Sequence, residues 1–340
     1  MSVSAGDDIK VEPCCNGDDP EKLAEFQARI DAGELVERDD WKPAGYSMGM
    51  LRMAEHHANS EIVGALPEGE WITRAPSLRR KLALIAKVQD EVGHGQMLYR
   101  VSQDLGKPRD QMLRDLIEGR TKYHNVFNYP APTWADVAMI QWLVDGAAIM
   151  NQKSLADGSY APYVRTMKRI NMEEAFHFKS GEDMVLTLMS GTPRQKAMCQ
   201  AAFDRWWWPC IMFFGPPDKE SVHNSDFMLW RIKTATNDTL RRAFVDRFAP
   251  AAKDLGIKIH LPGPSNPDDP AQPNSSLVED PECHVRNDGR WGFSTPDWDE
   301  FYRVIRGNGP CNKQRVGLRR MSYEQGQWVR RAVMGQVGVN

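Results

Sequence analysis

Cysteine is scarce in this chain of 340 residues, and it never occurs as a Cys-x-x-Cys pair. Sparse cysteines without that spacing fit reduced thiols better than a disulfide or zinc framework. We therefore expect neither disulfide chemistry nor a structural zinc site. The six cysteines are Cys14, Cys15, Cys199, Cys210, Cys283 and Cys311.

Long apolar runs and a strong net charge are also missing. No apolar run approaches the roughly 18 residues of a membrane span, and the acidic start MSVSAGDDIK has neither the basic nor the apolar part of a signal peptide. Lys and Arg number 43 against 46 Asp and Glu, a net charge of -3. This balance favours neither nucleic acid nor an anionic membrane as a partner. We expect a cytoplasmic protein that binds neither.

The motifs of several cofactor classes are absent. Gly93-His94-Gly95 does not make a dinucleotide fingerprint, and the chain contains neither a ferredoxin-type cysteine run nor a His-Glu-x-x-His zinc motif. The sequence therefore predicts no nicotinamide, flavin or iron-sulfur site within the chain, and it disfavours a zinc protease. Any electrons for redox chemistry must come from outside.

Helical periodicity dominates what is present. Apolar residues recur at three and four residue spacing near 21–33, 43–66, 76–105, 108–119, 133–157, 159–190, 193–213 and 226–255. Several of these segments exceed 20 residues, which predicts an all-α helical bundle. We divide the chain into an acidic, flexible N-terminal tail (1–40), a helical domain (41–260) and a C-terminal region (261–340). The last region holds a proline-rich loop, a possible β-hairpin at Asn287-Asp288-Gly289 and further helices.

A glutamate and a histidine three residues apart occur twice on apolar helix faces. The pairs are Glu91 with His94 and Glu174 with His177. Residues at this spacing share a helix face, so each pair points inward if its apolar stripe is the core. One such pair is a common accident, and a hydrogen-bonded core histidine is its more frequent explanation. A second copy makes that explanation weaker.

A carboxylate on its own helical segment precedes each pair by a similar distance. Glu61 lies 30 residues before Glu91, and Asp145 lies 29 residues before Glu174. This repeated unit is the ligand pattern of carboxylate-bridged di-iron and di-manganese bundles. Four carboxylates would balance two divalent cations, and oxygen and nitrogen ligands without thiolate favour iron or manganese over structural zinc.

Two residues next to the candidate ligands could also take part in the metal site. Glu173 could replace Glu174, although it does not lie three residues before a histidine. His57 lies four residues before Glu61 and could support a ligand from outside, but a satisfied core or surface histidine is the more frequent role.

Longer stretches around these residues resemble a known family. The resemblance runs from about Trp41 to beyond Trp328, and it is to the catalytic A subunits of bacterial ring 1,2-phenylacetyl-CoA epoxidases. The stretches are HHANSEIVGALPEGEWITRAPSLRRKLALIAKVQDEVGHGQ, WADVAMIQWLVDGAAIMNQ, KRINMEEAFHF, DRWWWPCIMFFGPPD and RIKTATNDTLRRAFVD. The resemblance implies a ferritin-like four-helix bundle with additional helices. It also implies a di-iron monooxygenase subunit that epoxidises phenylacetyl-CoA with O2 during phenylacetate degradation.

The resemblance further implies ligands and partners. Glu91 and Glu174 would bridge two iron ions, Glu61 and Asp145 would be terminal ligands, and the family has aspartate at the position of Asp145. With His94 and His177 they make the implied catalytic and metal-binding set. One implied partner is a reductase that carries flavin (FAD) and an iron-sulfur cluster and takes electrons from NADPH. The others are a metal-free structural ferritin-like subunit and a small accessory subunit.

Coenzyme A would need cations for its phosphates. The resemblance suggests that its contacts are Arg52, Lys122, Tyr123, His124, Asn125 and Lys233. The basic run Arg79-Arg80-Lys81 is a further candidate, but charge runs that open a helix are usually only solvated.

Three rival functions compete with the oxygenase. A metal-binding but non-catalytic ferritin-like partner and an iron-storage protein are disfavoured by the complete ligand set and the extra C-terminal region. A radical-generating reductase subunit would want a tyrosine close after the first histidine. Leu98 and Tyr99 lie four and five residues after His94, which places Tyr99 on the wrong face.

Overall fold

The computed structural model describes residues 19–221, 224–266 and 268–333, and these are mostly helical. The acidic first 18 residues, with Cys14 and Cys15, lie outside the described residues. Within the described part there is no β-sheet, only isolated β-bridges. The predicted all-α class is therefore confirmed.

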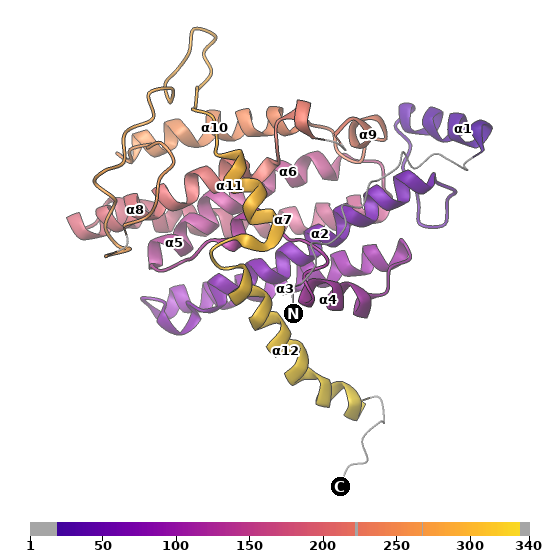
Figure 1. Cartoon of the computed structure of the whole chain (residues 1–340), viewed down its shortest axis with the longest axis horizontal. Coiled ribbons are helices and arrows are strands. Elements are labelled where there is room, and N and C mark those ends of the chain that lie inside the picture. Colours follow the sequence, from indigo (N-terminus) through magenta and orange to yellow (C-terminus); the bar gives the residue numbers. More distant parts are fainter. Residues whose placement is uncertain (1–18, 222–223, 267, 334–340) are drawn as a thin grey trace, which may run out of the picture.

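The bundle consists of α2 (Ala44–Gly69), α3 (Leu78–Asp104), α7 (Ala161–Met189) and a fourth unit in which α5 (Trp134–Met139) continues through a π-helical turn into α6 (Asp145–Ala156) (Figure 1). Helix α2 packs along α3, and α7 packs against α5 and α6. A contact between α3 and α7 joins the two pairs. Antiparallel pairs that bury their apolar faces together are the architecture of helical bundles, and this arrangement is consistent with the ferritin-like fold.

Further helices surround the bundle. They are α1 (Pro20–Asp31), α4 (Arg109–Ile117), α8 (Pro193–Ile211), α9 (Asn224–Leu229), α10 (Asn237–Asp254), α11 (Trp298–Arg303) and α12 (Asn312–Val333). Polar caps fix several starts: the Ser77 side chain accepts from the N–H of Arg80 at α3, and Thr192 forms a capping box with Gln195 at α8. Such caps satisfy backbone N–H groups that have no partner within the helix.

Two glycines let the bundle helices approach closely. A Cβ at Gly95 of α3 would lie 2.6 Å from the Ile62 side chain on α2. A Cβ at Gly181 of α7 would lie 2.4 Å from the backbone carbonyl carbon of Gln141. Any larger residue would force these helices apart, so both glycines set the spacing around the centre of the bundle.

The core is rich in aromatic residues. Trp206, Trp207 and Trp208 of α8 are all buried and pack with Phe203 and Phe244. The indole N–H of Trp206 donates to Asp136 at 3.0 Å, so the polar tip is satisfied. Helix packing accounts for this aromatic run.

The N-terminal part of the described chain is attached to the bundle. Helix α1 buries Phe26 and Ile30, and Val36 forms an isolated parallel bridge with Tyr160. The division at residues 40 and 260 stays a prediction.

The C-terminal region is largely irregular before its last helices. Its expected hairpin consists of one antiparallel bridge between Val285 and Trp291, around Gly289 at φ 78°. Helix α12 extends away from the body of the bundle (Figure 1). No helix within the described ranges is both long enough and apolar enough to cross a membrane.

Candidate metal centre

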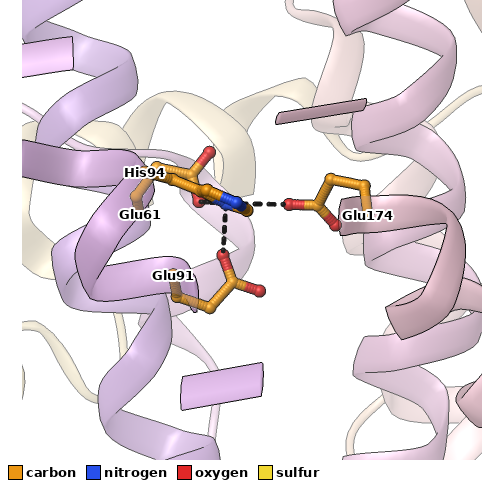
Figure 2. Close-up of side chains that lie close together, drawn as sticks. All are labelled: Glu61, Glu91, His94 and Glu174. Atoms are coloured by element: carbon orange, nitrogen blue, oxygen red, sulfur yellow. Dashed lines mark ion pairs between the residues drawn. The ribbon is translucent and has the colours of Figure 1, made fainter. Parts of the chain in front are cut away.

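The six side chains that the sequence predicts as ligands lie together inside the bundle. Each is at most 8% exposed to solvent. Their donor atoms form two overlapping groups, within each of which the atoms lie within 4.8 Å of one another. Glu91 and Glu174 belong to both groups. The first adds Glu61 and His94, drawn in Figure 2, and the second adds Asp145 and His177.

Four helical units supply these side chains. Glu61 comes from α2, Glu91 and His94 lie one turn apart on α3, and Glu174 and His177 lie one turn apart on α7. In Figure 2, His94 stands between Glu61 and Glu91 on one side and Glu174 on the other. The three-residue spacing aims both members of each pair inward because they share a helix face.

Asp145 is held by an irregular turn. It is the first residue of α6 and follows a π-helical turn over Ile140–Val144. A π turn accommodates one extra residue in a helix and occurs often at functional sites. From this turn, Gln141 donates through Nε2 to Glu68 of α2 at 2.9 Å, which ties the turn to the neighbouring helix.

The outer ring nitrogens of both histidines face carboxylates. Nε2 of His94 lies 2.8 Å from Glu173, and Nε2 of His177 lies 3.1 Å from Asp90. Such contacts orient a ring and leave its other nitrogen for a metal. Glu173 thus stands behind His94 and belongs to neither donor group, whereas Glu174 belongs to both.

The inner nitrogen of His94 provides a test of fit to a metal. Nδ1 is buried and has no hydrogen-bond partner among the described residues. It lies 3.5 Å from Glu174, 3.6 Å from Glu91 and 3.8 Å from Glu61. A buried imidazole nitrogen that faces several carboxylates without a hydrogen bond suits a shared cation. The donor set therefore fits hard or borderline divalent metals.

The cluster perturbs the pKa of its own members. Burial would raise the pKa of Glu61, but the nearby rings of His57 and His94 outweigh it and lower that pKa. Burial acts to lower the pKa of His177, yet Glu174 raises it to about 9. Burial also raises the pKa of Asp145 well above its usual range. A divalent metal that bound here would favour the ionised carboxylates and the neutral imidazoles, so its binding would be coupled to the release of protons.

A buried lysine that the sequence reasoning missed adjoins the cluster. Nζ of Lys87 lies 2.8 Å from Glu68 and 3.2 Å from Asp145, and it also contacts Glu91. Burial acts to lower the pKa of Lys87, but the carboxylates of Asp145, Glu68 and Glu91 hold it well above its usual range. The sequence did contain a sign that Lys87 belongs to the site, because Lys87 lies one turn before Glu91 on the same helix face.

His57 also contacts the cluster. Its Nε2 lies 2.8 Å from Glu61, and its Nδ1 lies 2.8 Å from the hydroxyl of Tyr163. The sequence left open whether this histidine supports a ligand or is a satisfied core histidine. Its position places it directly behind Glu61, as an outer partner of that carboxylate.

A cavity of about 430 Å³ reaches the carboxylates Glu61, Glu91, Asp145 and Glu174. Ile140, Val144, Phe213 and Phe214 contribute apolar walls. The imidazole of His124 stacks on Phe213 with ring centroids 3.7 Å apart, and burial holds the pKa of His124 well below its usual range. Apolar walls beside a polar cluster are suited to a small organic ring.

Most of the residues suggested for coenzyme A also line this cavity: Arg52, Lys122, His124, Asn125 and Lys233. Tyr123 does not line it. The Tyr123 hydroxyl donates to Asn128 at 2.8 Å and its ring packs with Val63 and Leu116. Cations next to an apolar cavity are what a substrate with an apolar head and a phosphate-bearing arm would require.

Comparison with known proteins gives consistent matches. Residues 20–328 match the family described as "Phenylacetic acid catabolic protein". The chain is 44% identical over 310 residues to the A subunit of 1,2-phenylacetyl-CoA epoxidase from Escherichia coli (strain K12), covering 91% of this chain and 94% of that protein. It is 24% identical over 177 residues to Benzoyl-CoA oxygenase component B of Aromatoleum evansii, covering 49% of this chain and 37% of that protein.

Proposed function

The chain belongs to the family of phenylacetic acid catabolic proteins, and from this membership we propose that it is the catalytic subunit of an oxygenase that epoxidises the ring of phenylacetyl-CoA. The close relative named as part of an epoxidase supports the reaction and the substrate. The cavity beside the carboxylate and histidine cluster supports a catalytic rather than a structural role. Both observations disfavour iron storage and a non-catalytic partner.

We further propose two iron ions as the cofactor. The observation that carries this proposal is the pair of overlapping donor groups that share Glu91 and Glu174. Glu61 and His94 would complete one metal site, and Asp145 and His177 the other. When bound, iron supplies the redox chemistry, in which O2 takes up two electrons and two protons, one oxygen atom enters the ring and the other leaves as water.

The chain's own side chains do the binding and the orienting. Asp90 and Glu173 hold the two histidine rings, and Lys87 holds Asp145 and Glu91 in place. The apolar cavity walls keep bulk water from the ring. Arg52, Lys122 and Lys233 would bind the phosphates of coenzyme A, since all three line the cavity.

The electrons must arrive through partners. We propose a reductase with flavin and an iron-sulfur cluster that oxidises NADPH, together with a metal-free ferritin-like subunit and a small accessory subunit. One relative is named as a subunit of its enzyme and the other as a component, which supports a multicomponent assembly. We also propose the cytoplasm as the location, where free buried thiols such as Cys199 and Cys210 are usual.

Reconstitution tests the proposal. The iron-loaded chain is incubated with the metal-free subunit, the reductase, phenylacetyl-CoA, O2 and NADPH, and the epoxide is sought by mass spectrometry. We expect about two irons per chain and epoxide formation, and we expect loss of both in His94→Ala and Glu174→Ala. His284→Ala, which changes an exposed histidine outside the cluster, serves as control. Normal epoxidation by His94→Ala with full metal content would overturn the assignment.

A further inference from the structure

The outward sides of α3 and α7 expose an unusual amount of apolar surface. The largest exposed fractions are 71% for Leu78 and 58% for Leu82 on α3, and 65% for Met172 and 78% for Phe176 on α7. Ile85, Val92 and Leu186 add to them. Exposed apolar side chains that gather on one surface mark an interaction site.

The spacing of these residues is that of a helix-packing surface. Leu78, Leu82, Ile85 and Val92 follow intervals of four, three and seven residues, and Met172 and Phe176 lie four apart. Apolar residues with an average spacing of 3.5 residues form the seam between packed helices. Such a seam faces the protein interior in most helices, but here it faces outward.

The two stripes belong to one surface. His94 contacts Glu173, and Asp90, four residues earlier on α3, contacts His177, four residues later on α7. The helices therefore run antiparallel in direct contact, so Leu82 lies level with Leu186, and Val92 lies level with Phe176. We name this surface the α3/α7 face: Leu78, Leu82, Ile85, Val92, Met172, Phe176 and Leu186.

Gly93 adds an observation from the same surface. It lies in the middle of α3, next to Val92, and a Cβ there would meet nothing within 4 Å. Glycine weakens a helix relative to alanine, and unlike Gly95 and Gly181 it makes no close approach inside this chain. A glycine at this point leaves room for close approach by something outside the chain.

The charges on the face indicate whether a second copy of this chain or a different chain binds there. Its carboxylates have partners: Asp90 contacts His177, Glu173 contacts Arg169, and Glu182 and Asp183 contact Lys179. In contrast, Arg79 and Arg80 at one end and Lys168 at the other form no ion pair in the described part of the chain. In a symmetric pair of copies, cationic ends would meet cationic ends whichever way the helices ran. Like charges in contact oppose such pairing.

We propose that the α3/α7 face binds a different helical subunit, one whose contacting helices present an apolar ridge flanked by acidic side chains. Its identification as the metal-free subunit of the oxygenase rests on the proposed function. The bound subunit would cover Asp90 and Glu173, the two carboxylates that hold the histidines of the centre from behind. Assembly would then enclose the outer side of the centre, while the cavity stays open on the other.

Binding measurements on charged variants test this surface. The purified metal-free subunit is titrated into the iron-loaded chain by calorimetry, with Leu82→Glu, Phe176→Glu and a matched control, Val278→Glu. Val278 is 64% exposed and lies in the C-terminal region, outside the face. We expect each face variant to weaken binding by about tenfold or more, as expected for a carboxylate buried without a partner in an apolar interface, and the control to bind as wild type.

Several results would overturn the inference. One is wild-type affinity in both face variants. Another is self-association of the wild-type chain that the face variants abolish, since a second copy would then occupy the face. Hydrogen exchange on the wild-type complex is independent of variant folding: we expect slower exchange over residues 82–93 and 172–186, and unchanged exchange there would contradict the docking site. The proposed function fails separately, if the wild-type complex forms but yields no epoxide.

Discussion

The ammonium nitrogen of Lys87 lies 3.2 Å from Oδ2 of Asp145, so a cation of the chain itself neutralises one side of a carboxylate that we propose as an iron ligand. The same nitrogen lies 2.8 Å from Glu68, which belongs to neither donor group. In the proposed metal-bound state, Lys87 and the metal would together balance the buried negative charge. This arrangement lets the bundle fold around its carboxylates before a metal binds.

Lys87→Met is expected to destabilise the metal-free chain by about 3 kcal/mol, because it leaves Glu68 and Asp145 buried without their cation. The iron-loaded chain should lose less, since the metals supply positive charge at Asp145. Urea unfolding of both forms, kept anaerobic with ferrous iron, measures the difference. Lys153→Met, at an exposed position of α6, is the control. Equal losses in the two forms would contradict this account.

Glu173→Gln is expected to weaken iron binding by about tenfold to a hundredfold. The carboxylate of Glu173 orients His94 through a 2.8 Å contact, and loss of such an outer partner typically has this effect. Competition with a chelator gives the affinity. Glu182→Gln, on the same helix and in contact with Lys179, should bind iron as wild type does. An unaffected Glu173→Gln would mean that packing alone orients the ring.

Gly181→Ala is expected to destabilise the protein by about 1 to 3 kcal/mol, because the added methyl group would overlap the backbone of the π turn at Gln141. Gly326→Ala in α12 provides the opposite case, since a Cβ there meets nothing within 4 Å. That change should be neutral or stabilise by up to about 1 kcal/mol. Denaturant unfolding compares the two, and equal effects would show that the close approach carries no strain.

The KM for phenylacetyl-CoA is expected to rise as the pH increases through about 8. Burial lowers the pKa of Lys233 to about 8, with Asp218 acting to raise it and Arg241 to lower it. The ammonium is present below this pH and lost above it, so its attraction for a phosphate weakens as pH rises, by up to about tenfold. Initial rates between pH 7 and 9 measure the change. Lys233→Arg, which stays charged, should flatten the profile, and an unchanged profile would remove Lys233 from the substrate contacts.

The sequence predicted the all-α bundle from its helical periodicity. It also indicated the six clustered side chains, because two Glu-x-x-His pairs and two preceding carboxylates are local patterns. Lys87 and Glu68 were not predicted as part of the site, because the burial of a lysine depends on where three separate helices converge. The short hairpin predicted around Asn287-Asp288-Gly289 consists of a single antiparallel bridge, between Val285 and Trp291. Turn residues fix where a chain reverses, whereas the length of pairing depends on what the strands can pack against.

The π turn over Ile140–Val144 had no sequence signal, yet the position of Asp145 depends on it. Wound as an uninterrupted α-helix, the same residues would rotate Asp145 by about 100° relative to the packed face of α5. The extra residue in the π turn thus lets Ile140 and Val144 line the cavity while Asp145 points into the cluster. A substitution that straightened this turn would take the fourth carboxylate out of reach of the others while every one of the six remained in the chain.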